Sequence, residues 1–265
     1  MRKIAVIGGT GVGDPKTLKS FKKMIVQTPY GPTEVNMGKI NGNQVIFIAR
    51  HGVGHSVPPH KVNYRANIWA LKSLGTEEIF ATTAVGSLNP KMKAGHFVVC
   101  DQVLDFTKSR VNTFFYGDGK PVVHVDFTNP YCPVLREKVI NILKDLKYTY
   151  HKTGCYVCAE GPRFETAAEI RMYAQMGGDL VGMTNMPESI LAREAEMCYT
   201  NCSIVTNMGA GISKTPLSHS EVVEAMNESS KKMESIIMAF INYDKTSKTT
   251  CTCAEAIKEF GGFKL

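Results

Sequence analysis

Hydrophobic and polar positions follow two recurring patterns along the chain. Short apolar runs rich in β-branched residues predict strands over residues 3–8, 44–49, 77–83, 97–105, 154–159, 179–183 and 202–207. Apolar residues three and four positions apart predict helices over 61–74, 133–147, 166–176, 187–198 and 219–242. Strands that alternate with helices favour an α/β fold, a single domain with a central mixed, largely parallel β-sheet flanked by helices.

Local signals predict where several of these helices begin and end. Gly75 and Gly177 directly follow two of the helical patterns, and glycine is typical just after a last turn. Pro187 suits a first helical position. Ser218 and Glu221 have the spacing of a capping box at the start of the last long helix.

The chain has 265 residues, 43% of them hydrophobic, which is enough for one large core. We expect a domain over residues 1–243 and a polar C-terminal tail over 244–265. No apolar run reaches the length of about 18 residues that predicts a membrane helix. A strand that starts at residue 3 leaves no room for a signal peptide, so we expect a cytoplasmic protein with no membrane partner.

The net charge of +7 is spread along the chain. No stripe of lysine and arginine with interleaved aromatic residues is present in the sequence, so nucleic acid is not an expected partner. A modest positive charge suits a small anionic substrate better.

Two pairs of cysteines stand close together in the sequence. Cys155 and Cys158 have the C-x-x-C spacing of zinc ligands, but the surrounding pattern is that of a strand, where residues three apart point to opposite faces. We therefore expect buried, reduced thiols and no metal site. The spacing of Cys251 and Cys253 does not decide their chemical state. A redox role or a strained disulfide is compatible with it, and free thiols are the default expectation.

The first strand leads into glycines at positions 8, 9, 11 and 13, an arrangement that can cradle an anion. The spacing does not match the G-x-G-x-x-G dinucleotide fingerprint, and a P-loop would need lysine where Asp14 stands. A plain glycine-rich turn explains the glycines alone. Because Thr10 adds a hydroxyl donor, a small oxyanion remains a possible ligand.

Polar and aromatic residues follow many of the predicted strands, at the end of the sheet where α/β folds bind ligands. Each has an ordinary explanation taken singly, such as a strand-end cap or a turn former. Their number favours a shared ligand site. The residues are Thr10, Arg50, His51, Thr82, Thr83, Phe164, Glu165, Met183, Thr184 and Asn207.

Several long motifs, from residue 3 to about 240, resemble the trimeric nucleoside phosphorylase family, which includes purine nucleoside and methylthioadenosine phosphorylases. They read "IGGTGVGD", "TPYGP", "ARHGVGHSVPPHKVNYRANIWALK", "TTAVGSL", "AEGPRFET", "VGMTNMPESILAREAEMCY" and "VTN". The resemblance implies that inorganic phosphate, as second substrate and without a cofactor, attacks the anomeric carbon of a nucleoside. It also implies a homotrimer.

The resemblance assigns residues to three parts of an active site. Those expected at the phosphate are Thr10, Arg50, His51, Thr83, Thr184 and the backbone of Ala84, with His55 a weaker candidate. Those expected at the base are Phe164, Glu165, Asn207 and Gly209, and those at the sugar are Met183, His219 and, from a neighbouring subunit, His124. Asn207, Glu165 and His51 are the expected catalytic groups.

The base-site residues depart from the adenine-specific members of the family. Those enzymes carry a "T-D-x-D" segment, where this chain has Thr206, Asn207, Met208 and Gly209, and a small hydroxyl residue where it has Glu165. An asparagine can donate to O6 and accept from N7–H, and a glutamate can accept from the N1–H that 6-oxopurines have and adenine lacks. These residues therefore favour inosine and guanosine.

His219 bears on the sugar. It stands where purine nucleoside phosphorylases have a histidine for the 5′-hydroxyl and methylthio-specific enzymes have an apolar residue, although a histidine that merely begins a helix is an equally simple explanation. The alternatives are 5′-methylthioinosine phosphorylase, then 5′-methylthioadenosine phosphorylase. From other classes, a non-catalytic nucleoside-binding module or a hydrolase would have no use for a phosphate cradle.

Overall fold

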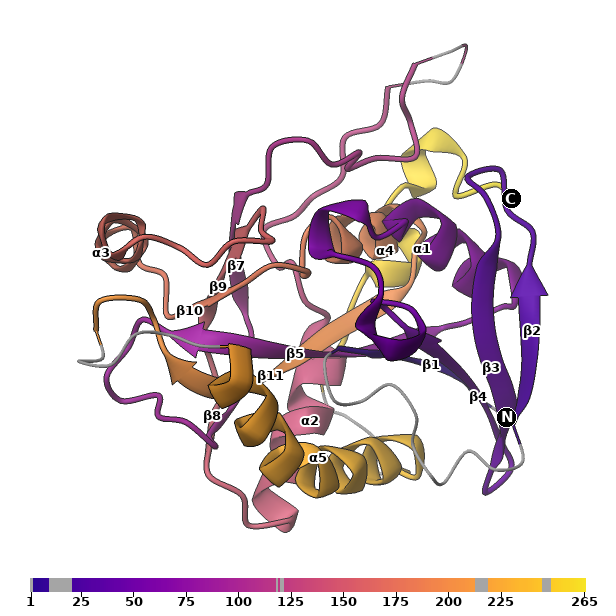
Figure 1. Ribbon diagram of the computed structural model, residues 1–265. Coiled ribbons are helices and arrows are strands. Elements are labelled where there is room, and N and C mark those ends of the chain that lie inside the picture. The colour runs from indigo at the N-terminus through magenta and orange to yellow at the C-terminus, as the bar shows by residue number, and fades with distance from the viewer. Residues whose placement is uncertain (1, 10–20, 118, 120–121, 213–218, 245–248) are drawn as a thin grey trace.

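The computed structural model describes residues 2–9, 21–117, 119, 122–212, 219–244 and 249–265, and of Val53 and 219–228 the backbone only. An eleven-stranded mixed sheet forms the centre of the described chain, with helices on both faces (Figure 1). The predicted fold class is therefore confirmed.

The main path of the sheet runs in the order β2-β3-β4-β1-β5-β10-β9-β7, while β11 pairs with β5 and β6, and β6 with β8. The pairs β1–β4, β1–β5 and β5–β11 are parallel, which brings their carboxyl ends to one edge. The strands are β1 (Lys3–Gly8), β2 (Lys22–Val26), β3 (Thr33–Ile40), β4 (Asn43–Ala49), β5 (Glu78–Ser87), β6 (Phe97–Val99), β7 (Gln102–Phe106), β8 (Tyr150–His151), β9 (Cys155–Ala159), β10 (Leu180–Gly182) and β11 (Cys198–Met208).

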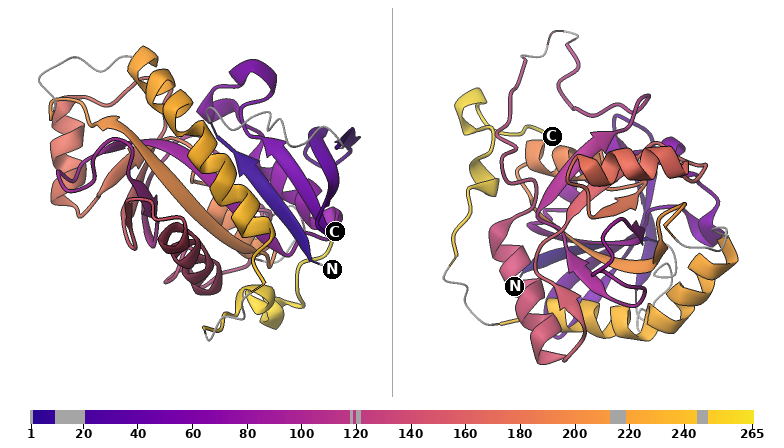
Figure 2. Two further views of the ribbon diagram at one scale, coloured as in Figure 1. Left: turned by 90° about the horizontal axis from the view of Figure 1, so that it is seen from below. Right: turned by 90° about the vertical axis from the view of Figure 1, so that its left-hand side faces the viewer.

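Helices α1 (Tyr64–Ser73) and α4 (Glu188–Glu194) cover one face of the sheet, and α2 (Pro133–Asp145) and α5 (His219–Ile241) cover the other (Figures 1 and 2). Helix α3 (Ala167–Gln175) lies beyond the ends of β9 and β10. Side chains of β1 alternate between the two layers: Ile7 packs in the core under α1 and α4, and Val6 packs in the core under α2 and α5. Short 3₁₀ helices cover Val53–His55, Pro59–Lys61, Cys253–Glu255 and Lys258–Phe260.

Two register details aim side chains at the carboxyl edge of the sheet. The β5–β11 ladder shifts between Val205 and Asn207, and such a bulge redirects the side chains that follow it. Strand β10 runs antiparallel to the end of β5, with Val181 opposite Gly86. The chain after β10 therefore returns alongside the middle of β5.

The sequence-based prediction places most helices and strands within a few residues of their observed boundaries. Where the boundaries differ, the cause is local. The predicted strand 97–105 is two strands, because the chain changes partners at Cys100 and Asp101, from β11 and β8 to β9. The predicted helix 187–198 ends at Glu194, since Glu196 has a left-handed φ of 54° and β11 already begins at Cys198.

Other boundaries also differ from the sequence-based prediction. Pro187 is the N-cap of α4 and not its first helical residue. The hairpin of β2 and β3 was not predicted, because its partly exposed strands lack a long continuous apolar run. The expected capping box lies partly outside the described residues, since Ser218 is not among them. No helix among the described residues is long and apolar enough to cross a membrane.

The described part of the tail, 249–265, packs back on the domain beside α4 and α1 (Figure 1). Ile257 is fully buried, and the Phe263 ring lies against Trp69 and Phe114 with centroids 5.4 and 5.1 Å away. Tyr30 joins this aromatic cluster, with its centroid 5.5 Å from that of Phe114. The division of the chain at residue 243 stays a prediction.

Gly182, the last residue of β10, gives a test of packing beside the site. A Cβ at this position would lie 2.1 Å from the Tyr156 hydroxyl oxygen and 2.7 Å from its ring carbon Cζ. We expect Gly182→Ala to lower the free energy of unfolding by about 1–3 kcal/mol through overpacking. In urea unfolding, Tyr156→Phe combined with Gly182→Ala should recover part of the loss, and strictly additive effects would contradict this contact.

Candidate active site

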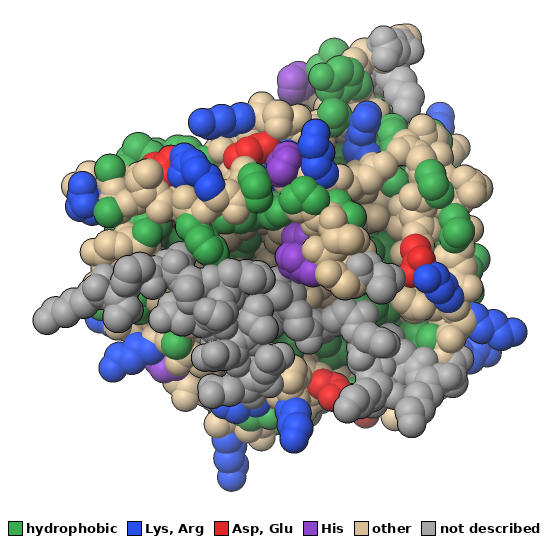
Figure 3. Space-filling model, in the orientation of Figure 1, with side chains coloured by type: hydrophobic (Ala, Val, Ile, Leu, Met, Phe, Trp, Pro, Cys, Tyr) green, Lys and Arg blue, Asp and Glu red, His purple; other side chains and the backbone are tan. Residues whose placement is uncertain are grey.

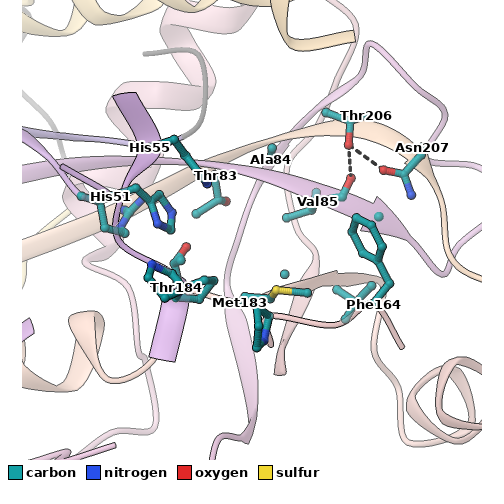
Figure 4. Close-up of a pocket in the computed structure, with 18 of the residues that line it drawn as sticks. His51, His55, Thr83, Ala84, Val85, Phe164, Met183, Thr184, Thr206 and Asn207 are labelled. Atoms are coloured by element: carbon teal, nitrogen blue, oxygen red, sulfur yellow. Dashed lines mark hydrogen bonds between the residues drawn. The ribbon is translucent and has the colours of Figure 1, made fainter. Parts of the chain in front are cut away.

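A cavity of about 390 Å³ opens at the carboxyl edge of the sheet, a size typical of small-molecule sites. Figure 3 shows this face hollowed near its centre, and Figure 4 shows residues of β5, β11 and three loops around the cavity. Most of the residues expected at the site line it. They are Arg50, His51, Thr83, Ala84, Phe164, Glu165, Met183, Thr184, Asn207 and Gly209, with His55 beside them.

Three expected site residues are not placed in the cavity. Thr10 lies outside the described residues, and so does the side chain of His219 at the start of α5. His124 is exposed on the segment between β7 and α2 and does not line the cavity of this chain. Gly9, the residue after β1, does line the cavity. A Cβ there would lie 2.7 Å from the Thr82 carbonyl oxygen, so this position requires glycine.

Arg50 follows β4 and is buried beneath the cavity wall. Its Nε donates to one carboxylate oxygen of Glu188 at 2.6 Å and its Nη2 donates to the other at 2.7 Å. Its Nη1 donates to the Thr82 carbonyl at 2.9 Å. A guanidinium has five N–H groups, so one on each terminal nitrogen remains for a ligand.

Glu188 controls the charge of this pocket. Burial works to lower the pKa of Arg50, but the Coulomb attraction and hydrogen bonds of Glu188 outweigh it and raise that pKa. The Tyr199 hydroxyl donates to the same carboxylate at 2.8 Å, which fixes its orientation. Glu188 was not among the site residues expected from the sequence. Its ion-pair partner lies 138 positions away, and no local pattern reveals such a pairing.

His51 is neutral at this site. Burial, helped by the nearby Arg50 charge, lowers its pKa to about 4. Its Nδ1 lies 2.8 Å from the Val57 carbonyl oxygen, which can only accept, so Nδ1 carries the proton. Nε2 is then an acceptor. The ring can therefore accept the P–OH proton of a phosphate.

Two of the threonines that line the cavity, Thr83 and Thr184, differ in what they offer. The Thr83 hydroxyl is 2.8 Å from the Ser203 hydroxyl and 3.3 Å from Asn201 Oδ1, so a buried network within the β5–β11 ladder already engages it. Thr83 also lines the cavity, and its contact with phosphate stays a prediction. Thr184 follows β10 and faces the cavity from the opposite side (Figure 4).

At the other end of the cavity one oxygen of a buried carboxylate has no partner among the described residues. Glu165 is 9% exposed, and its Oε1 is buried without a hydrogen-bond partner among the described residues. Burial raises the pKa of Glu165. Phe164 is 40% exposed and turns its ring toward the cavity (Figure 4). A buried acceptor beside an aromatic ring suits a flat ligand with an N–H donor at its edge.

Asn207 has a fixed amide orientation. Its Nδ2 donates at 2.8 Å to the Met208 carbonyl, which can only accept, so the nitrogen and oxygen cannot be exchanged. Its Oδ1 accepts from the Thr206 hydroxyl at 2.7 Å, and that hydroxyl is also 3.2 Å from the Val85 carbonyl (Figure 4). One N–H and one lone pair of the amide remain for a ligand. Thr206 was not expected to have this positioning role.

The chain belongs to the phosphorylase superfamily, whose sequence profile matches residues 3–242. The resemblance to nucleoside phosphorylases is thereby confirmed. A probable 6-oxopurine nucleoside phosphorylase of Thermococcus kodakarensis is 53% identical over 97% of this chain and 98% of its own length. A probable S-methyl-5′-thioinosine phosphorylase of Methanocaldococcus jannaschii is 48% identical over 96% of this chain and 98% of its own.

Solved structures show the same fold. A methylthioadenosine phosphorylase from an Antarctic soil metagenomic library superposes with a TM-score of 0.90 at 35% identity, covering 97% of this chain and 91% of that one. The methylthioadenosine phosphorylase of Schistosoma mansoni in complex with adenine gives 0.87 at 34% identity, with 91% of each chain covered.

The buried ion pair can be tested by replacing its acidic partner. Glu188→Gln removes the charge that balances Arg50, and we expect the free energy of unfolding to fall by about 3–5 kcal/mol in urea denaturation. The matched control is Glu34→Gln, which breaks an exposed ion pair with Lys23 at 2.7 Å and should cost less than about 1 kcal/mol. Equal effects of the two substitutions would contradict the central role of Glu188.

Proposed function

We propose that this protein is a purine nucleoside phosphorylase that cleaves 6-oxopurine nucleosides, inosine and guanosine, with inorganic phosphate to give the free base and ribose 1-phosphate. The observation that carries the proposal is the buried Oε1 of Glu165, which has no partner among the described residues, in a cavity that the fixed amide of Asn207 also lines. The name of the Thermococcus kodakarensis relative supports it.

The phosphate end would work mainly by electrostatics. The reaction passes through a transition state like an oxocarbenium ion, so it requires an anionic nucleophile held against the anomeric carbon. Arg50 supplies two free N–H groups, Thr184 and the backbone at Ala84 border the same space, and His51 accepts a P–OH proton. Glu188 neutralises the positive charge of Arg50. The phosphate would therefore be bound by the oriented N–H groups of the guanidinium and not by an excess of positive charge.

The base end would both select and activate the purine. Negative charge moves onto the base as the glycosidic bond breaks, and the free lone pair of Asn207 Oδ1 can accept from the N7–H that forms. The free N–H of Asn207 donates to O6, and Glu165 accepts from N1–H. Adenine presents an amino group in place of O6 and has no proton on N1, so it would leave both protein groups mispaired.

The second candidate is 5′-methylthioinosine phosphorylase, which the name of the Methanocaldococcus jannaschii relative favours. It shares the base and phosphate ends and differs at the 5′ position, where His219 is expected. The measurement that decides between the two candidates is the ratio of kcat/KM for inosine to kcat/KM for 5′-methylthioinosine. It is determined in the wild type and in His219→Val.

We further propose a cytoplasmic homotrimer in which the exposed segment between β7 and α2 carries His124 to the site of a neighbouring subunit. Val122 in this segment is 68% exposed and Tyr116 is 65% exposed, which suits burial against another copy. Light scattering coupled to size-exclusion chromatography measures the number of subunits, and a monomer would refute the proposal.

Phosphate dependence tests the reaction class. Base release from inosine should require phosphate, and Arg50→Lys, which keeps the charge but loses the fork, should lower kcat/KM for phosphate about 10- to 100-fold. Arg171→Lys is the matched control, since Arg171 is exposed on α3 and should leave the rate unchanged. Equal turnover in phosphate-free buffer would end the proposal and point to a hydrolase.

Substitutions at the base end test the substrate class. Glu165→Gln should lower kcat/KM for inosine about 10- to 100-fold, because a charged acceptor for N1–H is lost, and it should leave adenosine almost unchanged. Asn207→Asp should also lower inosine cleavage, since a carboxylate cannot donate to O6 and would face the Met208 carbonyl. Phe164→Leu is the control and should lower the two substrates by similar factors, because ring stacking is tolerant of the base. Faster wild-type cleavage of methylthioadenosine than of inosine would overturn the base assignment.

A further inference from the structure

Four cysteines from distant parts of the sequence meet beside the helix α2 N-terminus. The sulfur atoms of Cys132, Cys198, Cys251 and Cys253 all lie within 4.8 Å of one another. Cys132 is the N-cap of α2, Cys198 begins β11, and the other two belong to the tail. In the part of the chain that the structure describes, this is the one group of side chains placed closely enough to hold a metal ion, and none of the four lines the cavity.

The spacing of the sulfur atoms fits a tetrahedral metal site. Zn–S bonds of about 2.3 Å make the edges of a regular S₄ tetrahedron about 3.8 Å long. The sulfur atoms of Cys198 and Cys251 are 3.7 Å apart. A disulfide would need about 2.05 Å. Four thiolates in this arrangement are a ligand set that selects zinc or iron among biological metals.

We propose that this cysteine quartet binds one Zn²⁺ ion in a closed, structural site. All four positions around the ion would be filled by protein sulfur, so no position would remain for a substrate or water. The site would therefore act on stability and not on the reaction. The sequence-based expectation of no metal rested on Cys155 and Cys158, and neither belongs to the quartet.

Positive charge lies close to the quartet. The guanidinium of Arg193 is near enough to Cys253 to interact with it electrostatically. The N-terminus of α2 contributes further positive potential at Cys132. Four thiolates around a divalent cation keep a net negative charge, which Arg193 offsets.

Two of the four proposed ligands, Cys132 and Cys198, are held in place by the domain itself and not by the tail. The backbone N–H of Cys132 donates to the Tyr199 carbonyl at 2.8 Å, and that of Cys198 donates to the Glu77 carbonyl at 3.0 Å. A metal bound by these two and by Cys251 and Cys253 would tie the tail to the domain. Its binding free energy would add to folding, since the unfolded chain has no such preformed site.

The first experiment measures metal content directly. The protein is expressed in medium with zinc, purified with a reductant that is not a thiol and without chelator, dialysed, and analysed by inductively coupled plasma mass spectrometry. We expect about one zinc per chain. Cys251→Ser combined with Cys253→Ser should reduce zinc at least tenfold, whereas Cys155→Ser, a cysteine outside the quartet, should retain it.

The wild type alone keeps the proposal falsifiable if the double variant folds poorly. Intact mass under denaturing conditions counts disulfides, because each one removes two hydrogens. The proposal would be overturned if the protein contained no metal. The four cysteines would then be either free thiols that alkylate readily or paired as disulfides. Iron in place of zinc would overturn the choice of metal.

A second readout follows from the structural role. Removing zinc with a chelator should lower the thermal unfolding midpoint by about 5–10 °C, and adding zinc back should restore it. Cobalt substituted into the stripped protein should give the visible absorption of a tetrahedral thiolate site. An unchanged midpoint, with no cobalt spectrum, would contradict the site.

Discussion

The ion pair between Arg50 and Glu188 joins the elements on which the site depends. It connects the end of β4 to α4, and further hydrogen bonds extend it to the Thr82 carbonyl on β5 and the Tyr199 hydroxyl on β11. Both side chains are almost fully buried, so neither charge is tolerable without the other. The interaction therefore positions a guanidinium and also holds together the strands that carry the rest of the cavity wall.

The two ends of the cavity are organised by different means. At the end that Arg50 lines, a buried charge pair and a carbonyl fix the guanidinium, while burial keeps His51 neutral. At the end that Asn207 lines, the bulge at Thr206 and the Met208 carbonyl fix its amide, and Oε1 of Glu165 has no partner among the described residues. Oriented donors at one end and an unpartnered acceptor at the other are what the proposed phosphate and purine nucleoside require.

Much of this architecture could be predicted from the sequence, because strands, helices and strand-end polar residues leave local signals. The apolar run before Arg50 predicted β4, and the residues after it were expected at the site. Glu188 could not be assigned its role, since the contact with Arg50 depends on how α4 packs. The quartet of cysteines was missed for the same reason: sequence spacing reveals Cys251 and Cys253 but not the two core cysteines beside them.

The aromatic cluster also provides a built-in optical signal. Trp69 is the only tryptophan of the chain, and its ring lies 5.4 Å from that of Phe263 at the end of the tail. The same indole lies 5.6 Å from Tyr30 and 6.1 Å from Phe114, the latter in the segment between β7 and α2. The emission of a single fluorophore therefore reports, without any label, whether the tail and this segment are seated on α1.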